Sequence, residues 1–288
     1  MSNTIDWGQA AINNRLGYGQ AAKNNRLGFG ESEATSWSGE TNITGTPDTP
    51  SFSNVNSFSF DGIDEHFIGT STYSELDGLN KATFSFWIKP TSASARYGNI
   101  FHIPRNTTNG NSQAYCFIDN SNRIRFSMNS VSYYIYSNTN VININQWNHV
   151  LICVDLTAIN EGKIFINGID ETAINNLGTR TQFDTSVNGL RIGDEFGTYL
   201  IPFLGNIDEF AIWSGSDQRA NVSEIYSASG AVDLNNLATA PQPTTWQRFG
   251  DNGAVWNGAT WTMTDVNGGY VNRSINMVEA NRTTDVPT

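Results

Sequence analysis

The sequence is poor in charge, cysteine, histidine and long apolar runs. Only 15% of its 288 residues are charged, and 27 acidic against 16 basic residues give a net charge of −11. A surface with this excess of negative charge repels phosphate, so a nucleic-acid partner is not expected. No run approaches the ~18 apolar residues of a membrane span, and the polar N-terminus lacks the apolar part of a secretory signal. We therefore expect no membrane partner and no export.

The few cysteines and histidines favour structural roles. Cys116 and Cys153 each lie within an apolar run typical of a strand, so we expect buried free thiols rather than a disulfide. The three histidines, His66, His102 and His149, do not have the i, i+4 spacing of a helical zinc site. His149 lies in a strand pattern, which favours a hydrogen-bonded position in the core.

Short apolar runs separated by Asn, Ser, Thr and Gly turns occupy the middle of the chain. Their even spacing predicts an all-β fold, an antiparallel two-sheet jelly-roll sandwich, with one short helix over 221–228 that Asn221 and Glu224 cap. The predicted strands are 57–60, 66–69, 83–89, 99–103, 114–118, 123–128, 133–136, 147–156, 163–167, 190–193, 199–204 and 206–213. In the C-terminal part, residues 260–264 and 270–277 are further candidate strands.

The stretch from Phe203 to Trp213 is the one we expect the sandwich to be built around. From residue 206 its residues alternate, with Ile207, Glu209, Ala211 and Trp213 predicted on one face and the even-numbered residues on the other. A strand that is apolar on both faces at one end fits the middle of a sandwich.

The N-terminal residues contain a repeat instead of a strand pattern. Aromatic residues recur at intervals of 11 residues, at Trp7, Tyr18 and Phe29, and two of the copies also carry Leu16 and Leu27. Repeats this short cannot enclose a core of their own. We interpret them as an arm that attaches to partner proteins or sister subunits through these five side chains. A low-complexity leader without a partner is the alternative.

Composition divides the chain into three parts. Residues 1–50 form the repeat arm and a linker, residues 51–232 the β-sandwich, and residues 233–288 a C-terminal extension. The extension is too small and too poor in aliphatic residues to fold alone. We expect it to pack on the sandwich or on a neighbouring subunit.

Four motifs of the middle part resemble laminin-G-like (concanavalin A-like) domains. Phe60–Phe67 resembles their "FDG-x-DD" strand, and Trp147–Val150 with Gly162–Gly168 resembles their "W-H-V … G … Y-V-N-G" hairpin. Ile192-Gly193 and Gly205–Phe210 resemble their "I-G … F-x-G-x-I-D-D/E-V" closing strands, and the short helix Ser223–Tyr226 lies where they have an "L-s-x-x-E-I" turn. The resemblance implies the same jelly-roll fold.

The same resemblance raises the question of calcium, because these domains often hold a structural ion between their opening and closing strands. Asp61 or Asp64 with Asp208 would supply the hard oxygen ligands that Ca²⁺ prefers. The alternative is that each carboxylate caps a turn or accepts backbone hydrogen bonds.

A glycan site is a separate hypothesis from the residues themselves. Tyr134 and Tyr136 share one face of a predicted strand, Tyr133 lies on the other, and Tyr97 would join the pair in a stacking platform. The alternative is that these tyrosines fill the sandwich.

Catalysis is not expected. Glycosidases of this fold class need two carboxylates facing each other on one sheet, and their usual Glu-x-Asp-x-Glu strand is missing. Asp208 and Glu209 are adjacent and would point to opposite faces. The sequence also has no Ser or Cys nucleophile motif.

The two ends of the chain resemble virion proteins of marine bacteriophages that carry a laminin-G-like domain. The resemblance lies in the aromatic-Gly repeats, in Ser36–Ile43 and in Asn276–Pro287. It implies a non-enzymatic structural protein of the virion, made in the host cytoplasm and forming a homo-oligomer, that serves as capsid decoration, fibre or tail component and binds other virion proteins. The alternative is a carbohydrate-binding adhesin for host-surface glycans.

Overall fold

The computed structural model of the protein describes most of the chain beyond the N-terminal arm. The described residues are 52, 54–63, 66–69, 73–91, 98–104, 112–128, 133–185, 189–194, 202–249, 261–264, 270–273 and 282–288. From residue 54 on they belong to one compact unit. None of the helices in these ranges has the length and hydropathy needed to cross a bilayer.

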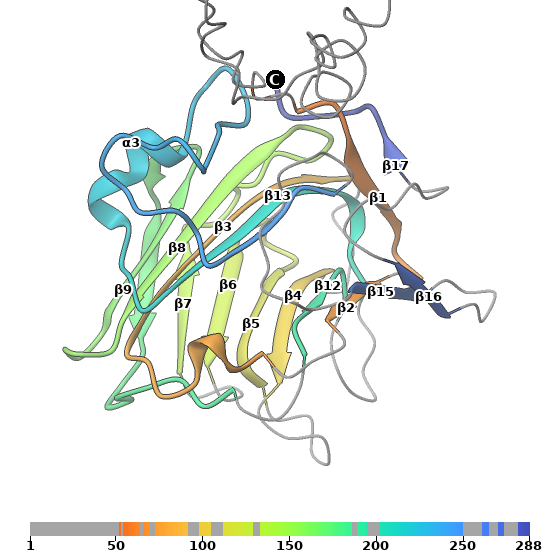
Figure 1. Cartoon of the computed structure of the whole chain (residues 1–288). Coiled ribbons are helices and arrows are strands. Elements are labelled where there is room, and N and C mark those ends of the chain that lie inside the picture. The colour runs from red at the N-terminus through yellow and green to blue at the C-terminus, as the bar shows by residue number, and fades with distance from the viewer. Residues whose placement is uncertain are drawn as a thin grey trace, which may run out of the picture. The chain divides into compact units, whose positions relative to one another are not determined.

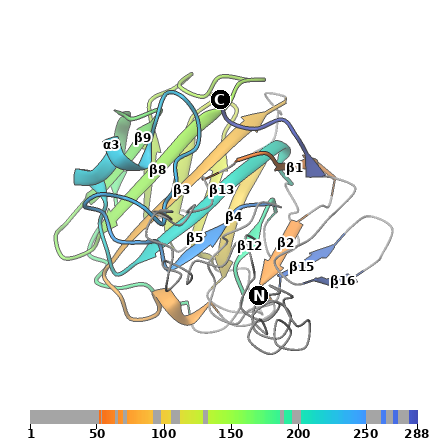
Figure 2. The ribbon, with the colours of Figure 1, turned by 45° about the horizontal axis from the view of Figure 1, so that its top comes forward.

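Two antiparallel sheets pack face to face in this unit (Figure 1). Sheet A has the strand order β10-β9-β8-β3-β13-β1-β17, and β14 also pairs with β13. Figure 2 shows β9, β8, β3 and β13 side by side in this layer. The strands of sheet A are β1 (Ser57–Asp61), β3 (Lys81–Pro90), β8 (Asn148–Asp155), β9 (Glu161–Ile166), β10 (Ile169–Asp170), β13 (Leu204–Ser214), β14 (Thr245–Gln247) and β17 (Arg282–Thr283).

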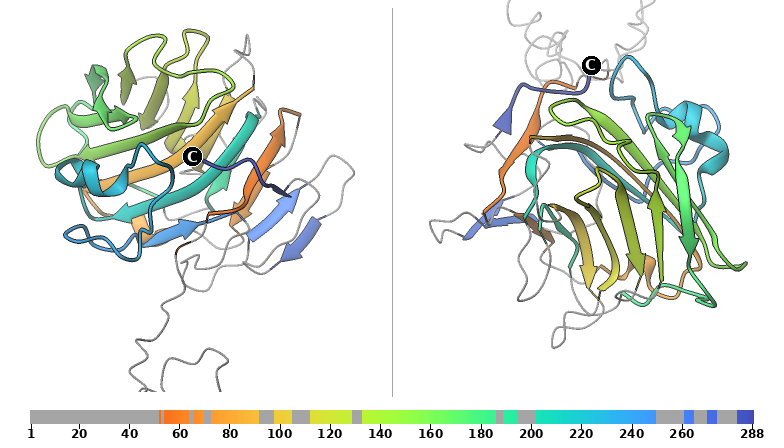
Figure 3. Two further views of the ribbon diagram at one scale, coloured as in Figure 1. Left: turned by 90° about the horizontal axis from the view of Figure 1, so that it is seen from above. Right: turned by 180° about the vertical axis from the view of Figure 1, so that it is seen from behind.

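Sheet B has the order β11-β7-β6-β5-β4-β12-β2-β15-β16. Figure 3 shows β4 to β7 of this sheet in the view from behind. Its strands are β2 (His66–Gly69), β4 (Gly98–Pro104), β5 (Ser112–Ile118), β6 (Ile124–Met128), β7 (Tyr133–Ser137), β11 (Thr172–Asn176), β12 (Arg191–Ile192), β15 (Trp261–Thr264) and β16 (Tyr270–Arg273). The described helical elements are η2 (Ser74–Leu76), η3 (Arg219–Asn221) and α3 (Val222–Ile225).

Phenylalanine rings from both sheets form the centre of the core. Phe84 of β3 stacks on Phe101 of β4 with centroids 4.9 Å apart, and Phe101 meets Phe210 of β13 edge-on at 5.4 Å. All three side chains are fully buried. Each buried ring removes a large apolar area from water, so these contacts between the two sheets stabilise the sandwich.

The predicted all-β sandwich is confirmed, and most predicted strands are present with ends that agree to within two residues. The strands that the sequence did not indicate are β10, β11, β14 and β17, which are short or polar. Residues 199–201 of one predicted strand lie outside the described residues, and only its last residue, Leu204, belongs to a strand, β13. Cys116 and Cys153 are buried and free, as predicted.

The predicted strict alternation of β13 is wrong because the strand contains a β-bulge. The register with β3 shifts between Asp208 and Ala211, and Glu209 has a φ of 49°. The extra residue turns the rest of the strand over, so Phe210 joins Ile207 in the core cluster. Trp213 is placed on the outer side of sheet A, not on the face of Ile207.

The bulge places Glu209 in a buried ion pair on the outer side of sheet A. Arg248 Nε donates to Glu209 Oε1 at 3.0 Å, and Trp246 Nε1 donates to Glu209 Oε2 at 2.5 Å. The three residues are at most 5% exposed. A buried carboxylate needs such partners because its desolvation is costly. The pair therefore ties the chain that follows the sandwich to the middle of β13.

The predicted helix is shorter than expected, and its capping box is wrong. The α-helical part, α3, ends at Ile225, and the Asn221 side chain makes no capping hydrogen bond. Asn221 Nδ2 donates to Gln218 Oε1 instead, and Glu224 Oε2 accepts the Thr239 backbone N–H at 2.9 Å. Both side chains bind neighbouring chain segments because these segments fold over the helix.

His149 occupies the hydrogen-bonded interior position that its strand pattern predicts. Its Nε2 lies 2.9 Å from Ser85 Oγ, and its ring packs against Trp87 and Tyr226 with centroids 5.1 Å and 5.4 Å away. Burial lowers the pKa of His149 to about 3, because charging the ring here would cost its hydration. His149 is therefore neutral at physiological pH.

Replacing Arg248 tests the buried ion pair. Arg248→Met leaves the Glu209 carboxylate buried without its counter-ion, so we expect the free energy of unfolding to fall by about 3 kcal/mol or more. Urea denaturation followed by tryptophan fluorescence measures it. Lys163→Met is the control, because it breaks the exposed Lys163–Asp170 pair and should cost less than about 1 kcal/mol. Equal losses in the two variants would contradict the role given to Arg248.

Replacing His149 tests the pH dependence of stability. The folded pKa of about 3 lies below the unfolded value of 6.5, so the unfolded chain takes up the proton first as pH falls. The stabilising effect of neutral His149 is complete above pH 6.5 and decreases as pH falls toward 3. Between these values wild type should lose about 1.4 kcal/mol per pH unit more than His149→Gln. Parallel stability curves for the two proteins, from urea denaturation at several pH values, would refute this.

Candidate functional site

The outer faces of the two sheets differ in what covers them. On sheet A, Trp213 and Trp246 are each 1% exposed, and Trp213 Nε1 donates to the Pro241 carbonyl at 2.7 Å. The segment 215–249 therefore covers this face. Such a face has little side-chain surface left for a ligand.

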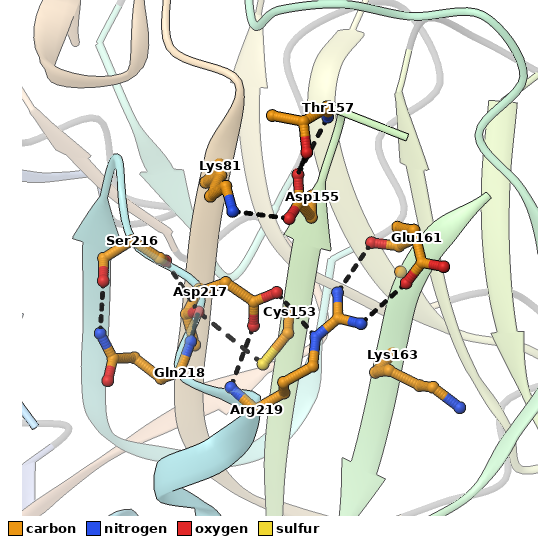
Figure 4. Close-up of polar contacts among 12 residues, drawn as sticks. Lys81, Cys153, Asp155, Thr157, Glu161, Lys163, Ser216, Asp217, Gln218 and Arg219 are labelled. Atoms are coloured by element: carbon orange, nitrogen blue, oxygen red, sulfur yellow. Dashed lines mark hydrogen bonds and ion pairs between the residues drawn. The ribbon is translucent and has the colours of Figure 1, made fainter. Parts of the chain in front are cut away.

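Polar contacts hold the start of that segment on sheet A (Figure 4). Arg219 forms ion pairs with Glu161 at 2.9 Å and Asp217 at 2.7 Å, and the Gln218 backbone N–H donates to Thr83 Oγ1 at 2.9 Å. Cys153 lies under this network, and burial raises the pKa of its thiol to about 12. A thiol that stays protonated is a poor nucleophile, so the cluster has the character of a structural contact.

Sheet B carries aromatic and basic side chains on the face away from the core. Cys116, Phe126 and Ile135 point into the core, so the alternating neighbours on β5, β6 and β7 point outward. The register then forms two rows across the strands. The first row contains Arg191, His102, Tyr115, Ser127, Tyr134 and Asn176. The second contains Asn99, Phe117, Arg125, Tyr136 and Ile174.

Tyr134 and Tyr136 form the centre of this face. Their rings stack with centroids 4.5 Å apart and planes inclined by 19°, and both side chains are half-buried. Neither hydroxyl makes a hydrogen bond to the part of the chain that the structure describes. Burial raises the pKa of Tyr136, so this phenol stays protonated and can donate as well as accept. The pair therefore offers two hydroxyls to a bound molecule.

Arg125 lies among these rings. Its guanidinium carbon is 4.6 Å from the Tyr136 centroid, 5.5 Å from Tyr134 and 5.2 Å from Phe117 on the neighbouring strand. Arg123 also approaches the Tyr136 ring, at 4.6 Å, and forms an ion pair with Asp119. We name Tyr115, Phe117, Arg125, Tyr134 and Tyr136 the sheet B platform.

The other end of the first row is more deeply buried. His102 is 1% exposed and lies 6.2 Å from the Tyr115 ring, and Arg191 is 3.7 Å from Asp194. Burial, with a smaller contribution from Arg191, lowers the pKa of His102 to about 3. His102 is thus neutral at physiological pH and supports Tyr115 through packing.

The structure keeps Asp61, one of the predicted calcium ligands, apart from Asp208. Asp61 pairs with Leu204 at one end of β13 and accepts the Ile63 backbone N–H at 2.8 Å, whereas Asp208 lies four residues farther along β13. That spacing corresponds to about 13 Å. Asp208 is buried and accepts Asn54 Nδ2 at 3.0 Å. Asp64 lies outside the described residues, so the predicted site stays untested.

The described ranges contain no group of three or more His, Cys, Asp or Glu side chains that could hold a metal ion. The arm residues Trp7, Leu16, Tyr18, Leu27 and Phe29 lie outside the described residues, as does Tyr97. Their predicted roles in attachment and glycan binding therefore stay predictions.

A family model decides the classification. The model described as the concanavalin A-like lectin/glucanases superfamily matches residues 65–223, more than half of the chain. The chain belongs to this superfamily. The predicted laminin-G-like or concanavalin A-like domain is thereby confirmed. Among curated proteins, no match was found.

Solved structures agree with this superfamily fold at low sequence identity. A heptameric SAP-like pentraxin from Limulus polyphemus is 18% identical over 76% of this chain and 94% of its own, with a TM-score of 0.52. A proposed carbohydrate binding protein from Bacteroides ovatus is 14% identical over 82% of this chain and 62% of its own, with a TM-score of 0.51. Neither name describes an enzyme.

The sequence indicated only part of the sheet B platform. Tyr134 and Tyr136 were predicted to share a face, and the structure stacks them. Tyr115, Phe117 and Arg125 were missed, although Tyr115 and Phe117 alternate with Ala114 and Cys116 in a readable strand pattern. What the pattern does not contain is the register between strands, which decides that Arg125 lies beside Tyr136.

Proposed function

We propose that this protein is a non-catalytic carbohydrate-binding module that binds saccharides on the outer face of sheet B. The stack of Tyr134 and Tyr136 carries the proposal. Aromatic rings beside polar groups suit sugars, whose C–H faces pack on rings and whose hydroxyls exchange hydrogen bonds with phenols. Membership in a superfamily named for lectins and glucanases supports saccharide binding, and so does the likeness to the Bacteroides ovatus protein.

The absence of catalysis is part of the proposal. The acid in the bulge, Glu209, is already engaged by Arg248 and Trp246 and covered by the chain after the sandwich. Its position on sheet A also separates it from the sheet B platform. Bound saccharides should therefore be released unchanged, which an assay for reducing ends after prolonged incubation measures.

Removing the tyrosine rings tests the binding face. Any saccharide that the full-length protein binds on a glycan array should bind Tyr134→Ala and Tyr136→Ala at least about tenfold more weakly in calorimetric titration, because each ring supplies ~1–2 kcal/mol of contact. Ile169→Ala is the control, because Ile169 is 62% exposed at the edge of sheet A. Unchanged affinity in both tyrosine variants, or an array on which nothing binds, would refute the proposed function.

We also propose that the module is displayed by a virion. The repeat with Trp7, Tyr18 and Phe29 and the resemblance of both ends of the chain to phage virion proteins motivate this second function, because regularly spaced exposed aromatic residues gain free energy when they dock on another protein. In this proposal the arm binds other virion proteins, copies of the chain form a homo-oligomer, and the sandwich contacts host glycans. The two proposals are compatible but independent.

Deleting the arm tests the virion proposal. A chain without residues 1–35 should stay folded and keep any glycan affinity but should no longer copurify with particles, since its anchor is gone. Particle incorporation is measured by immunoblot of purified virions, with the full-length chain as reference. Incorporation of the shortened chain at the full-length level would contradict the attachment role.

A further inference from the structure

One cation of the sheet B platform lacks a counter-ion. Four arginines and three lysines elsewhere in the described residues have a carboxylate partner: Arg123, Arg191, Arg219, Arg248, Lys81, Lys89 and Lys163. Within the part of the chain that the structure describes, Arg125 forms no ion pair or hydrogen bond, and its buried Nε has no hydrogen-bond partner there. This is unusual in a protein that carries 11 more negative than positive charges.

The surroundings of Arg125 hold its guanidinium without neutralising it. Contacts with the rings of Phe117, Tyr134 and Tyr136 fix its position and remove part of its hydration. They satisfy none of its N–H donors. A guanidinium is a planar fork that matches a carboxylate through two parallel hydrogen bonds, and it does so best where water is partly excluded.

The tyrosines next to Arg125 offer hydroxyls more than open ring faces. The Tyr136 ring is approached by Tyr134 at 4.5 Å and by the guanidinium groups of Arg123 and Arg125, each at 4.6 Å. A ring with three close neighbours has less free face for a sugar to stack on. The two hydroxyls, which make no hydrogen bond to the described residues, remain available. At Tyr136, polar recognition through the hydroxyl therefore adds to whatever ring contact a sugar makes with the pair.

We infer that the sheet B platform selects acidic saccharides, with the Arg125 guanidinium binding the sugar carboxylate and Tyr134 and Tyr136 donating hydrogen bonds to it or to neighbouring hydroxyls. The inference rests on the proposed function and adds the class of ligand. The positive charge of Arg125 would attract an acidic glycan locally, whereas the net negative charge of the protein as a whole would repel it.

The experiment compares saccharides that differ only in charge. The full-length protein is titrated with oligogalacturonate, oligoglucuronate and oligomannuronate, each beside its carboxyl-reduced neutral form. We expect the best acidic ligand to bind about ten- to hundredfold more tightly than its neutral form, the effect of one charged hydrogen-bonding partner. Added salt should weaken only the acidic ligand.

Two variants assign the preference to Arg125. Arg125→Met keeps an apolar stem on the rings and should bind both forms equally, whereas Arg125→Lys keeps the charge without the fork and should show a reduced preference. Lys163→Met removes one positive charge from sheet A and should preserve the wild-type preference. Equal binding of both forms by wild type, or an acidic preference that survives in Arg125→Met, would overturn the inference while leaving glycan binding intact. No binding of either form of any saccharide would remove the proposed function as well.

Discussion

The β-bulge at Glu209 is the constraint on which sheet A depends. One extra residue in β13 turns the strand over, so that Ile207 before the bulge and Phe210 after it both reach the core. The same residue leaves a carboxylate on the outer side that must be neutralised. Arg248 and Trp246 do so, and they belong to a segment nearly forty residues later in the chain. The bulge thereby links core packing to the closure of the outer face.

This closure makes the two sides of the sandwich different. On sheet A, the chain after β13 buries Trp213 and Trp246, and ion pairs around Arg219 fasten its beginning. Sheet B keeps half-buried tyrosines and an arginine on its outer side. Among the described residues, the outer face of sheet B is the more open of the two, and the aromatic and basic side chains of the sheet B platform lie on that face.

The platform illustrates how a β-sheet builds a site from ordinary strand patterns. Each of β5, β6 and β7 alternates apolar residues toward the core with larger polar or aromatic residues outward. Antiparallel pairing then sets Phe117, Arg125 and Tyr136 side by side. Ring contacts hold the guanidinium in place, but they do not replace the hydrogen bonds it loses on leaving water. That imbalance is the basis of our inference that this face binds an anion.

The sequence by itself determined the fold class and most strands of the sandwich, because the period of a strand and the residues of a turn are local properties. It also determined that Tyr134 and Tyr136 share a face and that His149 has a partner inside the protein. Only the tertiary structure decided the bulge at Glu209, the use of Arg248 as its counter-ion and the position of Arg125 among three rings. These features depend on the register between strands and on contacts between residues far apart in the chain. Neither the register nor such contacts produce a periodic pattern in a single sequence.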